Sequence, residues 1–155
     1  VETKLAIPKT MLKKAIGEHL LISTEQHFDS QTGPDGKKWQ DVKPRTRKRK
    51  KHPKILTERG HLRGDIHYQV TYDALLLGVG LAYGAIHQLG GEIKQENVTL
   101  HLKGKGRNTR FAKKGKGDHT KQVNRTITMP ARPYLGISRA DETEIVEITG
   151  DYLKV

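Results

Sequence analysis

Two short segments constrain the fold of this chain more than any other feature, because they are dense in residues that fix backbone shape. Residues 82–91 are Ala-Tyr-Gly-Ala-Ile-His-Gln-Leu-Gly-Gly, and residues 129–136 are Met-Pro-Ala-Arg-Pro-Tyr-Leu-Gly. Proline fixes its own φ and keeps the preceding residue away from helical angles, whereas glycine adopts angles that other residues avoid. The two segments therefore predict rigid corners, and neither has the residue types of a reaction centre.

The composition predicts one domain, residues 1–155, with a small core. A chain of 155 residues suits a single domain, but only 34% of its residues are apolar, so we expect long polar loops. No run of about 18 apolar residues is present, so we expect neither a membrane partner nor a secretory signal. The chain has no cysteine, which excludes disulfides and thiolate metal sites and is compatible with synthesis in a reducing cytosol.

The net charge of +12 is concentrated in two segments. Residues 43–54 contain eight basic residues and no acid, and residues 103–125 contain nine basic residues and one acid, Asp118. The rest of the chain is therefore net acidic. Segments that repel themselves are poorly ordered without an anionic partner, so both are predicted to be flexible loops.

Three interpretations of the basic segments stay open: solvation alone, contact with nucleic acid, and contact with an acidic neighbouring subunit. The residues proposed for such contacts are Arg45, Arg47, Lys48, Arg49, Lys50 and Lys51 in the first segment, and Lys105, Arg107, Arg110, Lys113, Lys114 and Lys116 in the second. Neither segment interleaves its charges with aromatic residues apart from Phe111, which argues against a platform for stacking single strands.

Apolar residues at three- and four-residue steps predict two long helices. The first covers residues 8–28, with Pro8 in its first turn and an apolar stripe formed by Met11, Leu12, Ala15, Ile16 and Leu20. The second runs from Ser138 to the C-terminus, and Ser138 and Asp141 cap its first turn. Residues 55–66 are expected to form a short helix or turn. Residues 83–89 are expected to form one or two helical turns that end at the glycine pair.

Alternating apolar residues predict two hairpins. Residues 67–72 and 75–80 form the first, and the continuous apolar run of its second strand indicates a buried strand. Residues 98–102 and 125–129 form the second, with residues 103–124 as its tip. The predicted fold class is therefore α+β: a single domain in which N- and C-terminal helices pack on a mostly antiparallel sheet, with long basic loops.

The shape-fixing segments and the lone tryptophan supply ten candidates for a structural motif or a subunit interface. These are Trp39, Tyr83, His87, Gln88, Gly90, Gly91, Pro130, Arg132, Pro133 and Tyr134. Trp39 is predicted to anchor the preceding turn to the core, with a ligand platform as the alternative. His87 is expected to tie neighbouring backbone groups through its ring nitrogens, with an acid–base role as the alternative.

The two prolines of residues 129–136 predict a stiff bracket between the last strand and the last helix. Arg132, placed between Pro130 and Pro133, is able to donate two hydrogen bonds to a carboxylate or a carbonyl. Two interpretations stay open here. The bracket either sets the helix angle within the subunit alone, or Arg132 or Tyr134 also contacts an adjoining chain.

The sequence supplies no catalytic constellation. It has no Gly-x-x-x-x-Gly-Lys-Ser/Thr loop, and the pairs Gly104/Gly106 and Gly115/Gly117 lack the strand-to-helix setting of a phosphate site. The histidines are not at metal-ligand spacings with a carboxylate nearby. We therefore expect no catalytic residues, no cofactor, no metal and no enzymatic activity.

In this order, the segments resemble the phage virion morphogenesis family, the tail completion and head–tail joining proteins of Mu-like and P2-like phages. The matching residues are Phe28, 33–39, Ile55, Leu56, Gly60, Leu62, Ile66, Val79, Gly80, 83–91, 129–136 and a closing helix over 141–153. Tyr-x-x-Ile-His-Gln-x-Gly-Gly followed by Pro-Ala-Arg-Pro is the specific pair. Residues 103–125 match no pattern of the family.

The resemblance implies a structural, non-enzymatic protein at the neck of a tailed phage. Such a protein forms a homo-oligomeric ring, six-fold if it matches a tail tube, that completes or terminates the tail and joins it to the DNA-filled head. Its expected partners are itself, the tail tube and the head–tail connector proteins, and phage duplex DNA in the channel. Its expected location is the head–tail junction of the virion, after assembly in the host bacterial cytoplasm. The alternative is a freestanding basic nucleic-acid-binding protein.

Overall fold

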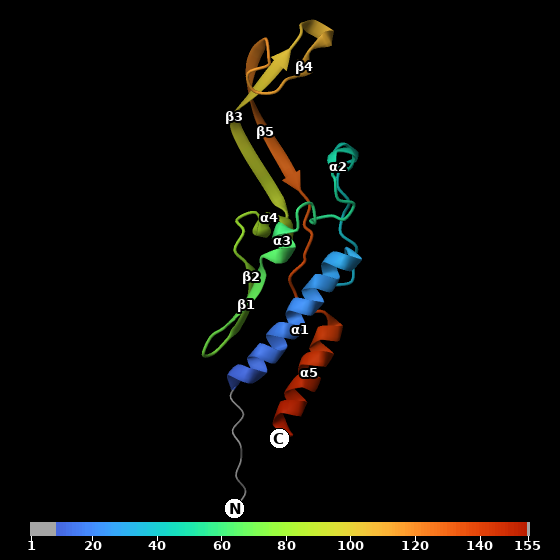
Figure 1. Cartoon of the computed structure of the whole chain (residues 1–155), viewed down its shortest axis with the longest axis vertical. Helices are drawn as coiled ribbons and strands as arrows, with labels where there is room; N and C mark the ends of the chain where they lie inside the picture. The colour runs from blue at the N-terminus through green and yellow to red at the C-terminus, as the bar shows by residue number, and fades with distance from the viewer. Residues whose placement is uncertain (1–8, 155) are drawn as a thin grey trace, which may run out of the picture. The chain divides into compact units, whose positions relative to one another are not determined.

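The computed structural model describes residues 9–154, and it confirms the α+β class predicted from the sequence (Figure 1). The chain divides into two compact units. We call the first unit, which contains residues 9–89 and 130–154 of the described chain, the body. We call the second unit, residues 90–129, the ribbon. The expected role of Pro8 in a first helical turn lies outside the described residues.

The long helix α1 (Lys9–Ser30) is the central element of the body and confirms the first predicted helix. In Figure 1 it lies between the β1–β2 hairpin and the C-terminal helix α5. Its buried side contains Gly17, Leu20, Thr24 and Phe28 at three- and four-residue steps. The predicted apolar stripe was therefore wrong at its N-terminal end, because Met11 is 53% exposed and small and polar residues occupy the contact side.

The strands β1 (Ile66–Val70) and β2 (Leu75–Val79) form the predicted antiparallel hairpin, in register from Ile66 opposite Val79 to Val70 opposite Leu75. The prediction that the second strand is buried was wrong, because Leu76 is 54% exposed. A two-stranded sheet that packs one face on a helix leaves its other face uncovered, so half of an apolar run stays in contact with solvent.

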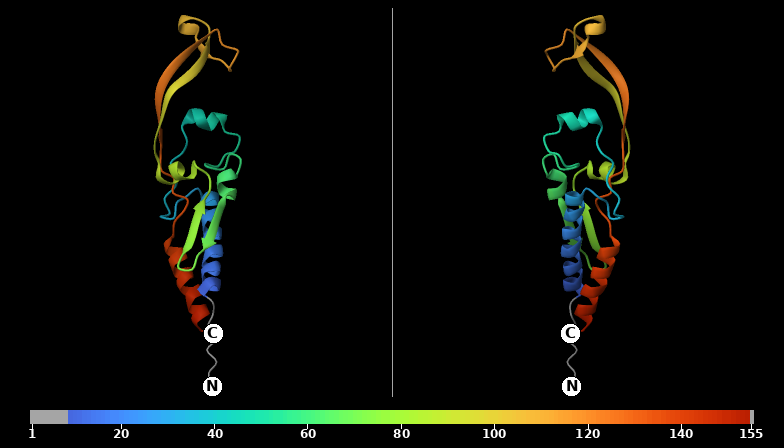
Figure 2. Two further views of the ribbon diagram at one scale, coloured as in Figure 1. Left: turned by 90° about the vertical axis from the view of Figure 1, so that its left-hand side faces the viewer. Right: turned by 90° about the vertical axis from the view of Figure 1, so that its right-hand side faces the viewer.

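The helix α5 (Arg139–Leu153) confirms the second predicted helix and its cap. Asp141 N donates to the Ser138 hydroxyl (3.2 Å), and Ser138 N donates to the Asp141 carboxylate (2.7 Å), which is a capping box. The same carboxylate bonds His19 Nε2 of α1 (2.9 Å). The helix packs on α1 instead of on a sheet, and both views of Figure 2 show the two helices alongside each other.

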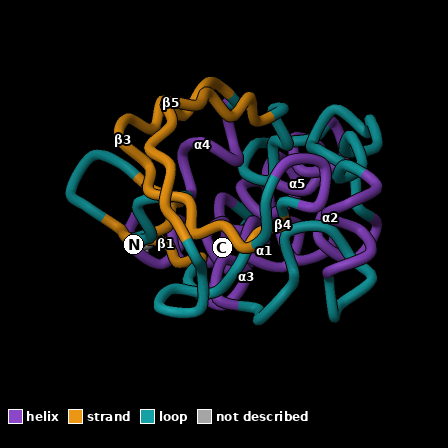
Figure 3. Tube along the Cα trace, turned by 90° about the horizontal axis from the view of Figure 1, so that it is seen from above, coloured by secondary structure: helices purple, strands orange, loops and turns teal. Residues whose placement is uncertain are grey.

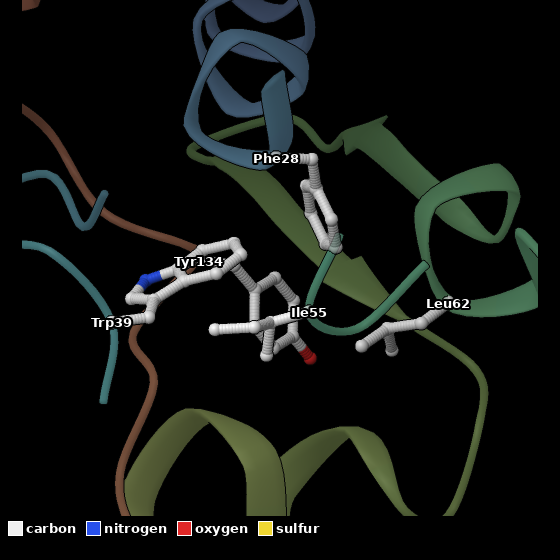
Figure 4. Packing of buried hydrophobic residues seen from close by; sticks show 5 residues of the cluster. All are labelled: Phe28, Trp39, Ile55, Leu62 and Tyr134. Atoms are coloured by element: carbon white, nitrogen blue, oxygen red, sulfur yellow. The ribbon is translucent and has the colours of Figure 1, made fainter. Parts of the chain in front are cut away.

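Short helices and turns complete the body: α2 (Pro44–Arg49), α3 (His61–Gly64) and α4 (Gly84–Leu89). The short helix or turn expected over residues 55–66 is confirmed by α3. The helical turns expected over residues 83–89 are confirmed by α4, after which Gly90 and Gly91 adopt φ of 71° and 135°. The core cluster of the body is shown in Figure 4 and consists of Phe28, Trp39, Ile55, Leu62 and Tyr134.

The ribbon consists of a long hairpin, β3 (Gly91–Lys103) and β5 (His119–Met129), with the two-residue strand β4 (Arg110–Phe111) and the 3-10 turn η1 (Gly106–Asn108) near its tip. The strands β3 and β5 run side by side in Figure 3. The predicted hairpin is present here, but its register differs from the predicted one. Residues 125–129 pair with residues 91–95, and residues 119–123 pair with residues 98–102.

Both basic segments are more ordered than the predicted loops. The first contains helix α2, and the second contains strand β4 and the first half of β5. Backbone pairing with β3 orders residues 119–125, because ladder hydrogen bonds do not depend on the charge of the side chains. The charge pattern alone therefore overestimated the length of both loops.

Candidate functional site

The strap, as we call residues 130–136, is the centre of the candidate site, because side chains from distant segments bond its backbone. Gln88 Oε1 accepts from the N–H groups of Tyr134 (2.9 Å) and Leu135 (3.0 Å), and Gln88 Nε2 donates to the carbonyl of Leu135 (2.8 Å). One amide side chain from α4 thus does what a neighbouring strand would do. Buried backbone groups need such partners, so Gln88 determines where the strap lies.

Two further side chains bond the carbonyl groups of the strap. Trp39 Nε1 donates to the carbonyl of Pro133 (2.7 Å), and His27 Nδ1 donates to the carbonyl of Tyr134 (3.0 Å). Trp39 is 6% exposed, and its ring meets that of Phe28 edge to face, with 5.4 Å between the ring centroids. Trp39 is therefore a packing residue, as predicted, and its one polar atom is used inside the body.

Tyr134 fills the core from the strap. Its side chain is fully buried, and its hydroxyl donates to the carbonyl of Gly84 (3.1 Å). Burial, with a smaller contribution from Asp65, raises the pKa of this hydroxyl, so it stays a donor. A Cβ at position 84 would lie 2.4 Å from Val79 Cγ2 and 2.9 Å from the Tyr134 hydroxyl, so α4 approaches the strap this closely only with glycine there.

Arg132 is buried to 4% exposure and bonds carbonyl groups instead of a carboxylate. Its Nε donates to the carbonyl of Gln40 (2.7 Å), and its Nη2 donates to the carbonyl of Asp41 (3.3 Å). Burial lowers the pKa of the guanidinium, and the charge of Asp41 opposes that shift. Both Arg132 and Tyr134 are thus buried and bonded within the subunit, as the intrasubunit interpretation of the bracket expects.

His87 ties the strap through its backbone, not through its ring. Its carbonyl accepts from the N–H of Arg132 (2.8 Å), whereas its buried Nδ1 has no hydrogen-bond partner among the described residues. The prediction that both ring nitrogens bond backbone groups was therefore wrong. Burial and the nearby charge of Arg132 lower the pKa of the ring, which keeps it neutral. Tyr83, 43% exposed, meets this ring edge to face at 6.0 Å.

The remaining candidates mark the connections between the two units. Gly90 and Gly91 follow α4, and Pro130 follows β5, so the chain passes from the body to the ribbon and back at these positions. Gly91 and Met129 are the last paired residues of the ribbon. Residues that fix backbone angles therefore stand at both crossings, which is where the sequence predicted rigid corners.

The first basic segment splits into paired and unpaired charges. Three of its cations pair with acids of the body: Arg47 with Asp41, Lys50 with Glu58 and Lys54 with Asp29. The hydrogen bond from Lys50 is the main reason that the pKa of Glu58 falls to about 2. The other five, Lys43, Arg45, Lys48, Arg49 and Lys51, are exposed and form no ion pair with any residue in 9–154.

Within that segment, Arg45, Lys48 and Arg49 form a positive face on α2. They stand at the three- and four-residue spacing that places side chains on one side of a helix. Arg47 lies outside this face and bonds inward to Asp41 and the carbonyl of Pro53. Of the six predicted contact residues, Arg47 and Lys50 therefore pair with acids of the body, whereas Arg45, Lys48, Arg49 and Lys51 are exposed and unpaired in the part of the chain that the structure describes.

The second basic segment has no internal neutralisation. No ion pair forms among residues 90–129, all of which the structure describes. Asp118, the one acid of residues 103–125, accepts from the N–H of Gly104 (2.9 Å). The exposed cations near the tip of the ribbon are Lys105, Arg107, Arg110, Lys113, Lys114 and Lys116. The tip is thus a positively charged surface that suits an anionic partner.

The chain matches the model of the phage virion morphogenesis family over residues 3–154. It belongs to that family. It is also 30% identical over 148 residues to the putative capsid assembly protein G of Escherichia phage Mu, with 92% of this chain and 74% of that protein covered. No solved structure matches the chain.

Membership in the phage virion morphogenesis family supports a structural or assembly role in a phage. In this member, residues 9–154 contain no cluster of three or more histidine, cysteine or acidic side chains able to hold a metal ion. No helix in the same part of the chain is long and apolar enough to cross a membrane.

Three residues that bond the strap were not predicted from the sequence: His27, Gln40 and Asp41. His27 was hidden because the buried side of α1 is formed largely by small and polar residues, which leave no apolar pattern that would mark a histidine among them. Gln40 and Asp41 act through their backbone carbonyls on Arg132, so their side-chain types carry no information about this role.

Proposed function

We propose that this chain is a structural subunit at the neck of a tailed phage, where it forms a ring that completes or terminates the tail and joins it to the DNA-filled head. The family match over residues 3–154 supports a role in phage assembly. The observation that carries the proposal is the strap. Its polar side chains and those around it bond backbone groups, so they fix the shape of the body and hold no reactant.

A ring requires two different surfaces that complement each other on neighbouring copies of one subunit. The proposed partners are further copies of this chain, six of them if the ring matches a tail tube, and the tail tube and connector proteins on either side. Rigid subunits suit this role because small changes in the angle between neighbours would prevent the ring from closing. The internal bonds of the strap supply that rigidity.

The exposed cations support contact with an anionic partner in this setting. Arg45, Lys48 and Arg49 on α2 and the cations at the ribbon tip face either the duplex DNA that passes through the channel or acidic surfaces of adjoining rings. Contacts to DNA phosphates need no base recognition, so they would allow the DNA to slide.

Electron microscopy of the purified chain, alone and mixed with tails that lack it, tests the proposal. We expect a ring in at least one of these conditions and added density at the end of the tail nearest the head. Sedimentation velocity checks the size of the free assembly. A chain that stays monomeric in both conditions and is absent from purified virions would overturn the proposal.

A freestanding nucleic-acid-binding protein is the second candidate, favoured by the unpaired positive face of α2. Such a protein would bind duplex DNA as a monomer or dimer, with an affinity that falls steeply as salt rises. A ring subunit would instead bind DNA appreciably only when assembled. Comparing DNA binding by the monomer and by the ring at two salt concentrations therefore separates the two functions.

A further inference from the structure

The ribbon is an amphipathic element with one apolar face. In the register of β3 and β5, one face contains Ile93, Val98, Leu100, Leu102, Val123, Ile127 and Met129, and we call it the apolar face. The opposite face is polar and contains Glu92, Lys94, Thr99, His101, Gln122, Asn124, Thr126 and Thr128. This segregation is what a half-buried sheet shows, although the ribbon has only two long strands.

A bulge keeps the apolar residues together. The pairing passes from Gln95 opposite Arg125 to Val98 opposite Val123, so β3 has one more residue than β5 at this point, and Asn97 there adopts φ of 52°. Without the extra residue, Val98 and the two leucines that follow would point to the side opposite Ile93. The irregularity therefore maintains one continuous apolar face along the ribbon.

This face is only partly covered. None of residues 90–129, all of which the structure describes, is buried, and the apolar residues of the face are all of intermediate exposure. A two-stranded hairpin is only marginally stable in water unless it packs on something else. The apolar face therefore has the properties of a surface that is completed by a partner.

The charges beside the apolar face select the kind of partner. Lys121 and Arg125 lie on this face, opposite Leu100 and Gln95, and the face has no acidic residue. Two such faces brought together would place cations against cations, which disfavours pairing between two ribbons. A surface with exposed apolar side chains and unpaired acids fits instead.

The outer side of α5 is such a surface. Val146 is 70% exposed and Leu153 is 78% exposed, and their seven-residue spacing places them on one side of the helix together with Glu142. Glu142, Glu144 and Glu147 form no ion pair with any residue in 9–154, whereas Asp141 is used in the helix cap and Asp151 pairs with Lys154. The helix thus offers apolar contacts and negative charge to a partner.

We propose that the apolar face of the ribbon in one copy of this chain docks on the outer side of α5 in the next copy. This inference rests on the ring proposed above, since it supplies the two different surfaces that a closed ring of identical subunits requires. The lengths permit this docking, because the 11 residues of β5 span about 35 Å and the 15 residues of α5 only about 22 Å. The whole helix therefore fits along the ribbon.

Disulfide cross-linking tests the docking. Because the chain has no native cysteine, only the introduced cysteines are able to form a disulfide. Two chains of different mass are prepared, one carrying Val123→Cys on the apolar face and the other Val146→Cys on α5. Because each chain has one cysteine, only a link between copies can form. We expect mixed rings to give a heterodimer on oxidation, and Gln122→Cys, on the polar face of the same strand, to give none with Val146→Cys.

An exchange of charges provides a second measurement that does not depend on the cysteine variants. Glu142→Lys with Glu147→Lys should shift the chain from rings to monomers, while circular dichroism shows that it remains folded. Adding Lys121→Glu and Arg125→Glu to the same chain should restore the rings. A purely structural role of these residues would not produce such rescue.

The outcomes separate this inference from the proposed function. Two results overturn the docking and leave the proposed ring function standing. One is rings in which positions 123 and 146 do not cross-link, and the other is rings in which two copies of Val123→Cys link to each other. A chain carrying both cysteines that closes the link only within itself also overturns the docking, because the ribbon then covers its own α5. Failure to form any ring, alone or with tails, overturns both.

Discussion

At the scale of single residues, Trp39 shows how one side chain joins segments that are far apart in the sequence. Replacing Trp39 with alanine removes the contact with Phe28 and the bond to the Pro133 carbonyl, so we expect the free energy of unfolding to fall by about 3 kcal/mol. Urea denaturation followed by circular dichroism measures this loss. Trp39→Phe keeps part of the ring contact and should lose less, and an unchanged midpoint for Trp39→Ala would contradict the anchor role.

Gln88 is the second residue whose removal should be costly. Its side chain makes three hydrogen bonds to the strap, so Gln88→Ala leaves the N–H groups of Tyr134 and Leu135 without partners. We expect a loss of about 2 kcal/mol or more in the free energy of unfolding, because an unpaired buried donor keeps its full desolvation cost. Gln26→Ala, at an exposed position of α1, serves as the control. Equal stabilities of the two variants would show that the strap needs no amide bracket.

At the scale of elements, two helical glycines should respond in opposite directions to the same substitution. A Cβ on Gly17 would lie 2.6 Å from the ring of Tyr68, so Gly17→Ala should push α1 from β1 and destabilise the body. A Cβ on Gly150 would meet nothing within 4 Å, so Gly150→Ala should stabilise α5 by about 0.5–1 kcal/mol. Thermal unfolding of both variants tests this pair, and a stabilising Gly17→Ala would show that α1 does not need this close approach.

Asp29 of α1 connects this helix to α3 and to the segment that contains Lys54, and it makes the body sensitive to acid. Hydrogen bonds from Arg63 of α3 and from Lys54 lower its pKa from 3.8 to about 2. Because the folded-state pKa is the lower one, the stabilisation is fully present well above the unfolded pKa of 3.8 and is lost as the pH falls through the folded pKa of about 2. Asp29→Asn should therefore flatten the fall of the unfolding free energy over this range. Denaturation at several pH values checks it, and parallel curves for the variant and the natural chain would contradict it.

Local signals account for the elements that the sequence predicted correctly. Ser138 and Asp141 define the start of α5 without reference to the rest of the chain, and the glycine pair at 90 and 91 ends α4 in the same way. The predicted core position of Trp39 also follows from its residue type. Such features depend on neighbours a few residues away, so a sequence is enough to find them.

The features that were missed depend on contacts between distant residues. Residues 91–97 contain one apolar residue, Ile93, and become recognisable as a strand only through their pairing with residues 125–129. The reason for a glycine at position 17 is the ring of Tyr68, and the partners of Arg132 are backbone carbonyls. Neither leaves a periodic pattern in the sequence.

At the scale of the whole molecule, some cations of the basic segments form ion pairs within the body, and others are exposed and free to contact a partner. Reversing Lys48, Arg49 and Lys51 together should leave the unfolding midpoint almost unchanged, since exposed unpaired charges contribute little to stability. Reversing Lys50 should lower the midpoint, because it places a second acid against Glu58. The triple variant should also weaken duplex binding and reduce its dependence on salt. Thermal unfolding and DNA titrations at two salt concentrations measure both effects, and a triple variant that fails to fold would show that these side chains are structural.

The two units should also differ in the free energy needed to open their backbone hydrogen bonds. The body has a buried core, whereas the ribbon contains no buried residue, so local opening costs less in β3 and β5 than in α1. In the monomer, amide hydrogens of the ribbon should therefore exchange faster than those near Phe28. If a neighbouring copy covers the apolar face, ring formation should slow exchange at Val98 and Val123, while the amides near Phe28 change little. Hydrogen exchange followed by mass spectrometry compares the two states, and ribbon amides that exchange equally fast in both would show that assembly leaves this face in water.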